Sequence, residues 1–319
     1  MNNKTFTAAV VGLGNIGLGY DLAHDKDYVQ THTKAYLNHK GIQLSFGVDP
    51  DSKKRKAFER FSRCAAYSSL DDASKDFPSV DIISFCVAPE DRGQLWDTAA
   101  RMRPKVVVLE KPLAKKVSEG KQVLSWAKKN KIALAVNYLR RFEPSTYVLK
   151  AALEKRRLGK TLGVDIRYNG GFFNNASHYI DLMILFFGKP KKVCHTRVKK
   201  AGGDVHADFV MEYPSFHIQG RSIEMACPVG EITFWCDNGK FFYQKFGQRI
   251  DIFEAQPDPV FRKFNELAMT KTIETTMAYA MKGMADNIFQ FCRDKEKLLS
   301  DGQSAMETLE LCGNILSNL

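Results

Sequence analysis

The sequence predicts an α/β protein in two parts: a doubly wound parallel sheet, then an α+β region with a large, mostly antiparallel sheet. Up to residue 136, short apolar runs alternate with helix-like segments, as in parallel sheets wound with helices. From residue 161 onward, strand-like runs follow one another with Gly, Pro and Asn turns between them, as in antiparallel sheets. We therefore expect one domain over 1–136 and a second over 137–319, with the last helix packing back on the first domain.

The first strand, Phe6 to Val11, runs directly into a turn with the pattern G-x-G-x-x-G. In this pattern the first glycine makes a tight turn, the second lets the backbone approach a pyrophosphate, and the third lets a helix pack closely on the sheet. The phosphates then lie at the N-terminus of that helix. The sequence thus predicts a dinucleotide-binding Rossmann domain, and its predicted turn residues are Gly12, Gly14, Asn15, Ile16 and Gly17.

The second strand, Ile42 to Val48, ends at Asp49. A carboxylate at this position can accept hydrogen bonds from the adenosine ribose hydroxyls, which favours NAD over NADP. Asp49 comes later than the usual distance of about 20 residues, and a polar insertion at 21–31 accounts for the difference. The basic residues at 53–55 could instead hold a 2′-phosphate, so NADP stays an alternative cofactor.

Two further strands end in residues suited to ligand binding, because ligands of open α/β sheets bind at the carboxyl ends of the strands. One strand is expected at 80–87, and the buried apolar run Val106–Leu109 is another, which must end by Pro112 because proline cannot donate to a strand ladder. The residues predicted to contact the cofactor at these strand ends are Val87, Ala88, Pro89, Glu110 and Lys111. The other elements expected in this domain are helices at 52–61, 69–77, 90–102 and 114–130 and a strand at 132–136.

Beyond residue 136 the pattern changes. A segment with paired arginines, 137–144, leads into a helix ending near residue 158. The expected strands are 161–169, 190–199, 204–212, 215–222, 229–236 and 240–254. The expected helices are 174–187 between the first two strands, then 273–294 and 302–317 at the end of the chain.

The helix at 174–187 carries polar residues at helical spacing. Asn174, His178 and Asp181 are separated by four and three residues, so they would share one helix face beside apolar side chains. This pattern indicates a binding or catalytic site, although a capping asparagine and a hydrogen-bonded core histidine would produce it too. We predict no metal site, because one histidine stands there without a second nitrogen or sulfur ligand nearby.

Composition argues against several classes of protein. The net charge is +11, but the basic residues are scattered and accompany no nucleic-acid-binding motif, so a solvated basic surface or an acidic small-molecule substrate is expected rather than a nucleic acid. No apolar run approaches the roughly 18 residues of a membrane span. The seven cysteines form no CxxC pair, which favours reduced thiols and a cytoplasmic location. We interpret His24 and His32 as loop and helix-face residues.

Taken together, the chain resembles the Gfo/Idh/MocA family of NAD(P)-dependent sugar and polyol oxidoreductases. The resemblance rests on the glycine turn, on Glu110-Lys111-Pro112, on the segment 137–144 and on the Gly-Gly…Ser-His-x-x-Asp pattern at 170–181. The chain departs from the family at two points. Asn174 stands where the family often has an aspartate, and residues 90–93 stand where a histidine often follows the proline of the fourth strand.

The resemblance implies that Lys111 and His178 are catalytic and that Asn174 orients the sugar. A histidine suits the base because its ordinary pKa lies near neutrality. The resemblance places Tyr138, Arg140, Arg141 and Asn175 on the substrate side, together with Asn174 and His178. Arginines suit carboxylate and phosphate groups, so we expect an anionic sugar such as a nucleotide sugar or sugar acid. The family also implies a homo-oligomer, a dimer or a tetramer.

Hydride transfer between NAD(P) and a sugar is therefore the expected function. A catalytically inactive dinucleotide-sensing regulator on the same fold is the alternative, with Asn174 marking the lost chemistry. It would bind the cofactor without transferring hydride. The hypothesis of a nucleic-acid-binding protein rests on net charge alone. Such a protein would bind DNA or RNA with an affinity that falls as the salt concentration rises.

Overall fold

The computed structural model describes residues 5–23, 27–201 and 204–317. Within it the chain forms two compact units, one of Met1–Phe142 with Ala278–Leu309 and one of Glu143–Met277 with Glu310–Leu319. The first unit therefore includes a segment from late in the chain. The domain boundaries expected from the sequence, 1–136 and 137–319, remain a prediction. The expected packing of the last helix on the first domain also remains a prediction.

The first unit contains a six-stranded sheet with the order β3-β2-β1-β4-β5-β6, all of whose neighbouring strands are parallel. The strands are β1 (Phe6–Val11), β2 (Ile42–Val48), β3 (Ala65–Tyr67), β4 (Ile82–Phe85), β5 (Val106–Leu109) and β6 (Ala133–Val136). This is the strand order of the Rossmann fold, in which the direction of winding reverses between β1 and β4. The predicted doubly wound sheet is confirmed.

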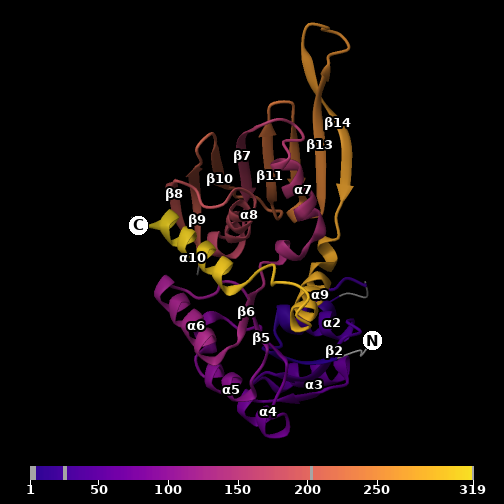
Figure 1. Cartoon of the computed structure of the whole chain (residues 1–319), viewed down its shortest axis with the longest axis vertical. Coiled ribbons are helices and arrows are strands. Elements are labelled where there is room, and N and C mark those ends of the chain that lie inside the picture. Colours follow the sequence, from indigo (N-terminus) through magenta and orange to yellow (C-terminus); the bar gives the residue numbers. More distant parts are fainter. Residues whose placement is uncertain (1–4, 24–26, 202–203, 318–319) are drawn as a thin grey trace. The chain divides into compact units, whose positions relative to one another are not determined.

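Helices cover both faces of this sheet (Figure 1). They are α1 (Tyr20–Leu22), α2 (His32–Leu37), α3 (Ser52–Ser62), α4 (Leu70–Asp76), α5 (Leu95–Met102), α6 (Val117–Asn130), α9 (Ala280–Cys292) and the part of α10 (Gly302–Leu316) up to Leu309. Alternate residues of β5 show the arrangement, because Val107 and Leu109 pack with α4, α5 and α6 while Val106 and Val108 pack with α2, α3 and α9. Burial on both faces explains why the run is continuously apolar.

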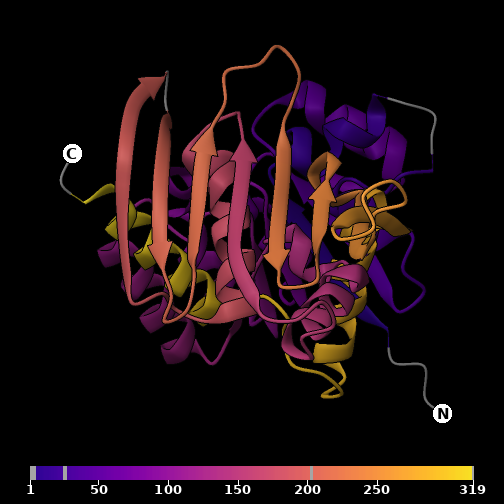
Figure 2. The ribbon, with the colours of Figure 1, turned by 90° about the horizontal axis from the view of Figure 1, so that it is seen from above.

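The second unit contains an eight-stranded sheet with the order β14-β13-β12-β11-β7-β10-β9-β8, in which only the β7–β10 pair is parallel. The strands are β7 (Thr161–Tyr168), β8 (Lys192–Ala201), β9 (Asp204–Glu212), β10 (His217–Ser222), β11 (Gly230–Cys236), β12 (Gly239–Gln244), β13 (Arg249–Pro257) and β14 (Asn265–Glu274). Figure 2 shows strands of this sheet side by side. The predicted, mostly antiparallel sheet is confirmed.

The helices α7 (Pro144–Glu154) and α8 (Ser177–Phe187) lie within this unit, and the part of α10 from Glu310 onward belongs to it as well. The strands turn their buried residues, such as Ile166, Phe209 and Phe234, toward Tyr179 and Met183 of α8 in one core. Opposite faces of the same strands alternate with these buried positions and are more exposed, as in Thr161–Tyr168 and His217–Ser222. The core therefore fixes the orientation of α8.

Several predicted boundaries were wrong. The expected strand 240–254 is two strands, because a turn at Lys245–Gly247 with three successive positive φ angles (52°, 58° and 97°) separates β12 from β13. The expected helix 273–294 starts only at Ala280, because residues up to Glu274 pair with β13 as β14. The β13–β14 hairpin extends well beyond the shorter neighbouring strands (Figure 1).

Boundaries also shift in the first unit. The expected helix 90–102 begins as a 3₁₀ turn, Pro89–Arg92, and becomes α-helical only at Leu95. The expected helix 114–130 begins at Val117, after a loop that follows the cis peptide bond Lys111–Pro112. In the described residues, no helix combines the length and apolar character that crossing a bilayer requires.

Candidate active site

The glycine turn is folded so tightly that two of its three glycines cannot carry a side chain. Gly12 has φ of 92°, and a Cβ there would lie 2.7 Å from the Cys86 carbonyl oxygen. A Cβ on Gly17 would lie 2.0 Å from the Gly12 carbonyl oxygen. At Gly14, by contrast, a Cβ would meet no atom within 4 Å. The structure thus explains Gly12 and Gly17 by packing within the protein, and it leaves open space beside the backbone of Gly14.

Asp49 ties this turn to the end of β2. Its side chain is 5% exposed; Oδ2 accepts the Leu13 N–H at 2.9 Å and Oδ1 accepts the Asp51 N–H at 2.9 Å. Each carboxylate oxygen can still accept a further hydrogen bond. Of the basic residues at 53–55, Arg55 donates to the backbone oxygens of Asp49 and Pro50, while Lys54 lies 3.6 Å from Asp49 Oδ2.

A buried arginine holds the loop that follows β5. Arg92 is 2% exposed, and its guanidinium donates to the carbonyl oxygens of Val87, Glu110, Pro112 and Leu113 at 2.5–3.3 Å. Nε contributes one of these bonds and each terminal nitrogen contributes two, so all five N–H donors of the guanidinium are engaged. Burial lowers the pKa of Arg92 to about 10, which leaves it cationic at neutral pH. The carbonyls that it binds flank Lys111 on both sides.

A series of buried hydrogen bonds ends at Glu110, the residue before Lys111 in the same loop. Tyr36 Oη lies 2.6 Å from Ser84 Oγ, Ser84 Oγ lies 3.0 Å from His32 Nδ1, and His32 Nε2 lies 2.9 Å from Glu110 Oε1. Asn137 Nδ2 donates to the same Glu110 oxygen at 2.7 Å. The pKa of Glu110 is lowered: burial acts to raise it, but His32, Asn137 and Lys111 together outweigh burial.

This series of hydrogen bonds has one consistent direction. The Glu110 carboxylate only accepts, so His32 donates to it through Nε2–H, and in the neutral form of the imidazole Nδ1 accepts from the Ser84 hydroxyl. Burial raises the pKa of Tyr36, so Tyr36 keeps its proton and donates to Ser84. Hydrogen bonds aligned in this way strengthen one another in a region of low dielectric constant. His32, which we interpreted as a helix-face residue, is instead fully buried beneath the Lys111 loop; His24 lies outside the described residues.

The second unit carries the other group of candidate residues. Two glycines with positive φ, Gly170 (76°) and Gly171 (97°), lead into a π-helical turn, Phe172–Ala176, that continues as α8. Asp204 fixes this turn, because its carboxylate oxygens accept the N–H groups of Phe173 at 3.1 Å and Asn174 at 3.0 Å. The sequence had not singled out Asp204, since thirty residues separate it from Asn174.

Exposure falls along the predicted polar face. Asn174 is exposed and its amide donates to the Gly170 oxygen at 3.3 Å, His178 is half-buried, and Asp181 is fully buried. Asn175 is half-buried and donates to the Asn169 oxygen at 2.6 Å. Asn174 and His178 are thus the more accessible members of the predicted face.

A known protein family matches part of the first unit. Residues 6–138 match the GFO_IDH_MocA model, described as an oxidoreductase family with an NAD-binding Rossmann fold. This part of the chain belongs to the Gfo/Idh/MocA family. The recognition of the family and the predicted NAD cofactor are confirmed.

Two curated relatives that match part of this chain are named uncharacterized oxidoreductases. One, from Schizosaccharomyces pombe, is 24% identical over 50% of this chain and 48% of its own length. YhhX from Escherichia coli is 24% identical over 40% of this chain and 41% of its own length. The chain thus matches about half the length, or less, of each curated relative.

Among solved structures, the WlbA dehydrogenase of Bordetella pertussis in complex with NADH and UDP-GlcNAcA has a TM-score of 0.76 to this chain. The sequence identity is 18%, and the match covers 99% of this chain and 95% of that one. At this identity the likeness shows that the two chains share a fold.

The remaining predicted substrate residues lie after β6, where Leu139–Phe142 forms a 3₁₀ turn. Tyr138, Arg140 and Arg141 are 2%, 7% and 6% exposed, and Arg141 donates to the Leu299 oxygen at 3.4 Å. Burial limits how much of each side chain a substrate could contact.

In the second unit, a cavity of about 640 Å³ is bordered by Asn169, Gly170, Asn175, His206, Ile223, Glu224, Met225, Ala226, Cys227 and Pro228.

Within the described ranges, no group of three or more His, Cys, Asp or Glu side chains is placed to hold a metal ion.

Sequence reasoning missed three residues that position the candidate site: His32, Arg92 and Asp204. The sequence did offer one indication for Arg92: it lies in the segment 90–93, where the chain lacks the histidine that the family often has. A buried arginine in that segment requires acceptors, and strand ends supply main-chain carbonyls.

Proposed function

We propose that this chain is an NAD-dependent oxidoreductase that transfers a hydride between the cofactor and a ring carbon of an anionic sugar. The observation that carries the proposal is the support of Lys111. In an NAD-binding Rossmann domain, the loop of Lys111 is held by the buried Arg92 from one side and by the His32–Glu110 pair from the other. Such support restricts the positions that Lys111 can adopt, as catalysis by positioning requires.

The residues of the glycine turn fit NAD. The open space at Gly14 admits a pyrophosphate against the backbone. Asp49 retains acceptor capacity for ribose hydroxyls, and Arg55 is already engaged with backbone oxygens, which favours NAD over NADP. Val87, Ala88 and Pro89 would contact the cofactor at the end of β4. When bound, NAD⁺ supplies the hydride acceptor.

In the oxidation direction, a sugar CH–OH loses a hydride to the cofactor and a proton to the protein. His178 would take the hydroxyl proton. Lys111 would donate a hydrogen bond to the same oxygen and stabilise the negative charge that develops there. Asn174 would orient the hydroxyl through its amide, since an asparagine cannot accept a proton as the family's aspartate can. The same groups would act in reverse for reduction.

An anionic sugar, such as a nucleotide sugar or sugar acid, is supported by the net charge of +11. Arg140 and Arg141 are 7% and 6% exposed, so only these small exposed parts would meet its anionic group. The WlbA dehydrogenase, which shares this fold, was crystallised with UDP-GlcNAcA. The cavity beside Asn175 offers room for part of such a substrate. We further propose a cytoplasmic homo-oligomer, in keeping with the free cysteines of the chain.

A non-catalytic dinucleotide sensor is the second candidate. Asn174 favours it, because this residue replaces a carboxylate of the family. The presence of both Lys111 and His178 favours the enzyme.

A titration and an activity screen separate the two. NADH and NADPH are titrated into the purified chain while the fluorescence of Trp96 and Trp126, both in the first unit, is followed. Tighter binding of NADH than NADPH supports the cofactor assignment, and NAD⁺ reduction with UDP-linked sugars or sugar acids supports the enzyme. NADH binding without turnover on any sugar tested supports the sensor. Absence of binding to either cofactor contradicts both.

A further inference from the structure

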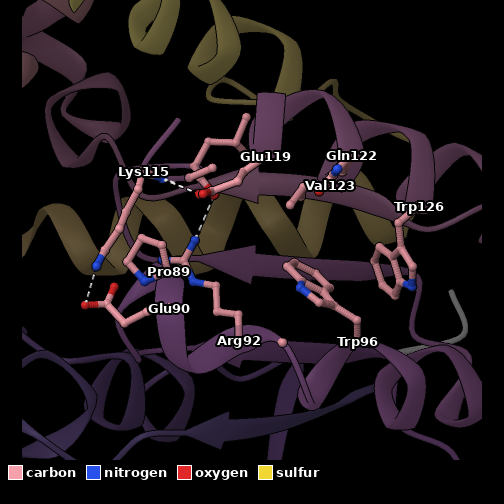
Figure 3. A pocket seen from close by; sticks show the side chains of 12 residues that line it. Pro89, Glu90, Arg92, Trp96, Lys115, Glu119, Gln122, Val123 and Trp126 are labelled. Atoms are coloured by element: carbon pink, nitrogen blue, oxygen red, sulfur yellow. Dashed lines mark hydrogen bonds and ion pairs between the residues drawn. The ribbon is translucent and has the colours of Figure 1, made fainter. Parts of the chain in front are cut away.

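The first unit contains a cavity of about 440 Å³ between α5, α6 and the loops that precede them (Figure 3). Its volume lies within the range of small-molecule sites, roughly 300–1,000 Å³. Its lining residues fall into an aromatic and apolar wall and a polar rim. Only Pro89 belongs to the residues predicted to contact NAD, and Lys111 does not line it.

Two tryptophans form the apolar wall. Trp96 on α5 and Trp126 on α6 lie with their ring centroids 4.6 Å apart at an angle of 55°, and both are only partly buried. Both rings pack against the core of the first unit, which limits their movement. Leu113 and Val123 extend this wall. Indole rings held in this way favour a flat aromatic ligand, because stacking needs no matching hydrogen-bond pattern.

The rim carries two carboxylates, Glu90 and Glu119, and one lysine whose charge Glu90 balances. Lys115 is already paired with Glu90 at 2.8 Å, and Glu119 accepts the Lys115 backbone N–H at 3.2 Å (Figure 3). Arg92 lines the cavity, but all five of its N–H donors are engaged by main-chain carbonyls. The acceptors that a ligand can meet at this rim are the carboxylates of Glu119 and Glu90 and the amide oxygen of Gln122. Acceptors favour a ligand with N–H donors.

We propose that this cavity binds an uncharged planar heteroaromatic molecule carrying an amino group, at a site that borders the NAD site at Pro89 and is otherwise distinct from the NAD and sugar sites. The molecule stacks on the face of one indole, meets the other at an angle because the two ring planes are inclined by 55°, and donates its amino hydrogens to Glu119 or Glu90.

The cavity is connected to the proposed catalytic loop through Arg92. The same guanidinium that borders the cavity holds the carbonyls of Glu110 and Pro112, the neighbours of Lys111. Occupancy therefore acts on the placement of Lys111 and changes the turnover number. This consequence rests on the proposed function, whereas binding itself does not.

The probe is 2-aminopurine, a fluorescent amino-heterocycle whose emission falls when it stacks on indole. It is titrated into the full chain with saturating NAD⁺ present, so that the adenine part of the cofactor site is occupied. We expect saturable quenching, competition by adenine, and little competition by the planar anion benzoate. Absence of quenching in the presence of NAD⁺, or equal competition by benzoate, would overturn the proposal.

Two variants test the location. Gln122→Trp places a large side chain at an exposed position of α6, where it blocks the cavity without disturbing the core, and it should weaken probe binding at least about tenfold. Trp126→Leu should weaken it by a similar factor, with circular dichroism confirming the fold. Trp235→Phe, in β11 of the second unit, is the matched control and should bind the probe as the unmodified chain does. Unchanged binding in Gln122→Trp places the probe elsewhere and contradicts the proposal, whether or not the chain turns over a sugar.

Discussion

His32 Nε2 and Glu110 Oε1 lie 2.9 Å apart, although 78 residues separate them along the chain. His32 is fully buried, and the Glu110 side chain is 14% exposed. One residue begins α2 and the other precedes Lys111. The pair thus connects the start of α2 to the loop at the end of β5, in the same unit of the molecule.

Replacement of His32 by alanine leaves the Glu110 carboxylate short of its main partner. Loss of a hydrogen bond to a charged group costs roughly 1.5–3 kcal/mol, and we expect a value near the lower end because Asn137 and Lys111 remain. Urea unfolding at pH 7, followed by the fluorescence of Trp96 and Trp126, measures this loss. His217→Ala, at an exposed position of β10, is the control and should change the unfolding free energy little.

The same pair predicts a pH dependence. The pKa of Glu110 is lower in the folded state, so its contribution to stability is present above the unfolded value, about 4.3, and is lost as the pH falls through the folded pKa. Without His32 the pKa of Glu110 rises, and protonation relieves the buried charge at higher pH. The stability difference between His32→Ala and the unmodified chain should therefore shrink below about pH 5. A difference that stays constant down to pH 4 would contradict the role given to His32.

Arg92→Lys tests the support of the Lys111 loop. A lysine has three donors on one nitrogen and cannot satisfy the four carbonyls that Arg92 binds. Unpaired buried acceptors cost about 1–3 kcal/mol each, so we expect a loss of several kcal/mol. In folded protein, the turnover number should fall about tenfold or more, with the NADH dissociation constant little changed. Arg101→Lys, at an exposed ion pair with Asp71, is the control and should leave the unfolding free energy and the turnover number unchanged.

The three glycines of the turn should respond differently to alanine. Gly12→Ala and Gly17→Ala place Cβ atoms against backbone oxygens and should destabilise the first unit with or without cofactor. Gly14→Ala meets open space, so the protein should keep its stability while NADH binding weakens about tenfold or more, or ~1.4 kcal/mol. Gly163→Ala, whose Cβ would lie 3.6 Å from the His217 oxygen, is the control for both measurements. Unaltered NADH binding in Gly14→Ala would exclude a pyrophosphate at this position.

The sequence predicts the first unit well where one face or both faces of an element are buried. The apolar run Val106–Leu109 and the strand Ile42–Val48 match the structure residue for residue, because burial leaves few alternatives for such runs. His32 shows the limit. Its α2 begins after a polar insertion and has only six residues, which is too short for a hydrophobic period to reveal a buried face.

The second unit shows a different limit. The residues of β14 are mostly exposed and alternate weakly, so their pairing with β13 is determined by the partner strand rather than by their own pattern. Similarly, Asp204 caps the turn at Asn174 only because the sheet brings β9 to the start of α8. Contacts of this kind depend on the complete fold, and local sequence carries no signal for them.

The residues assigned to the chemistry give the last prediction. Lys111→Ala and His178→Ala should each lower the turnover number at least about 10²-fold, the usual scale for acid–base groups. Lys128→Ala and His217→Ala, both at exposed positions, are matched controls and should retain normal turnover. Near-normal rates in both Lys111→Ala and His178→Ala would contradict the assignment.

Asn174 should behave differently from these two residues. Its amide orients the hydroxyl without exchanging a proton, so Asn174→Ala should lower kcat/KM about tenfold, the effect of one hydrogen bond. Asn174→Asp restores the family's carboxylate but brings it near Asp204, whose Oδ2 accepts the Asn174 N–H at 3.0 Å. Repulsion between the two carboxylates should keep Asn174→Asp no faster than the unmodified chain. A clear gain in turnover for Asn174→Asp would instead mean that Asn174 marks weakened chemistry, and it would favour the sensor over the enzyme.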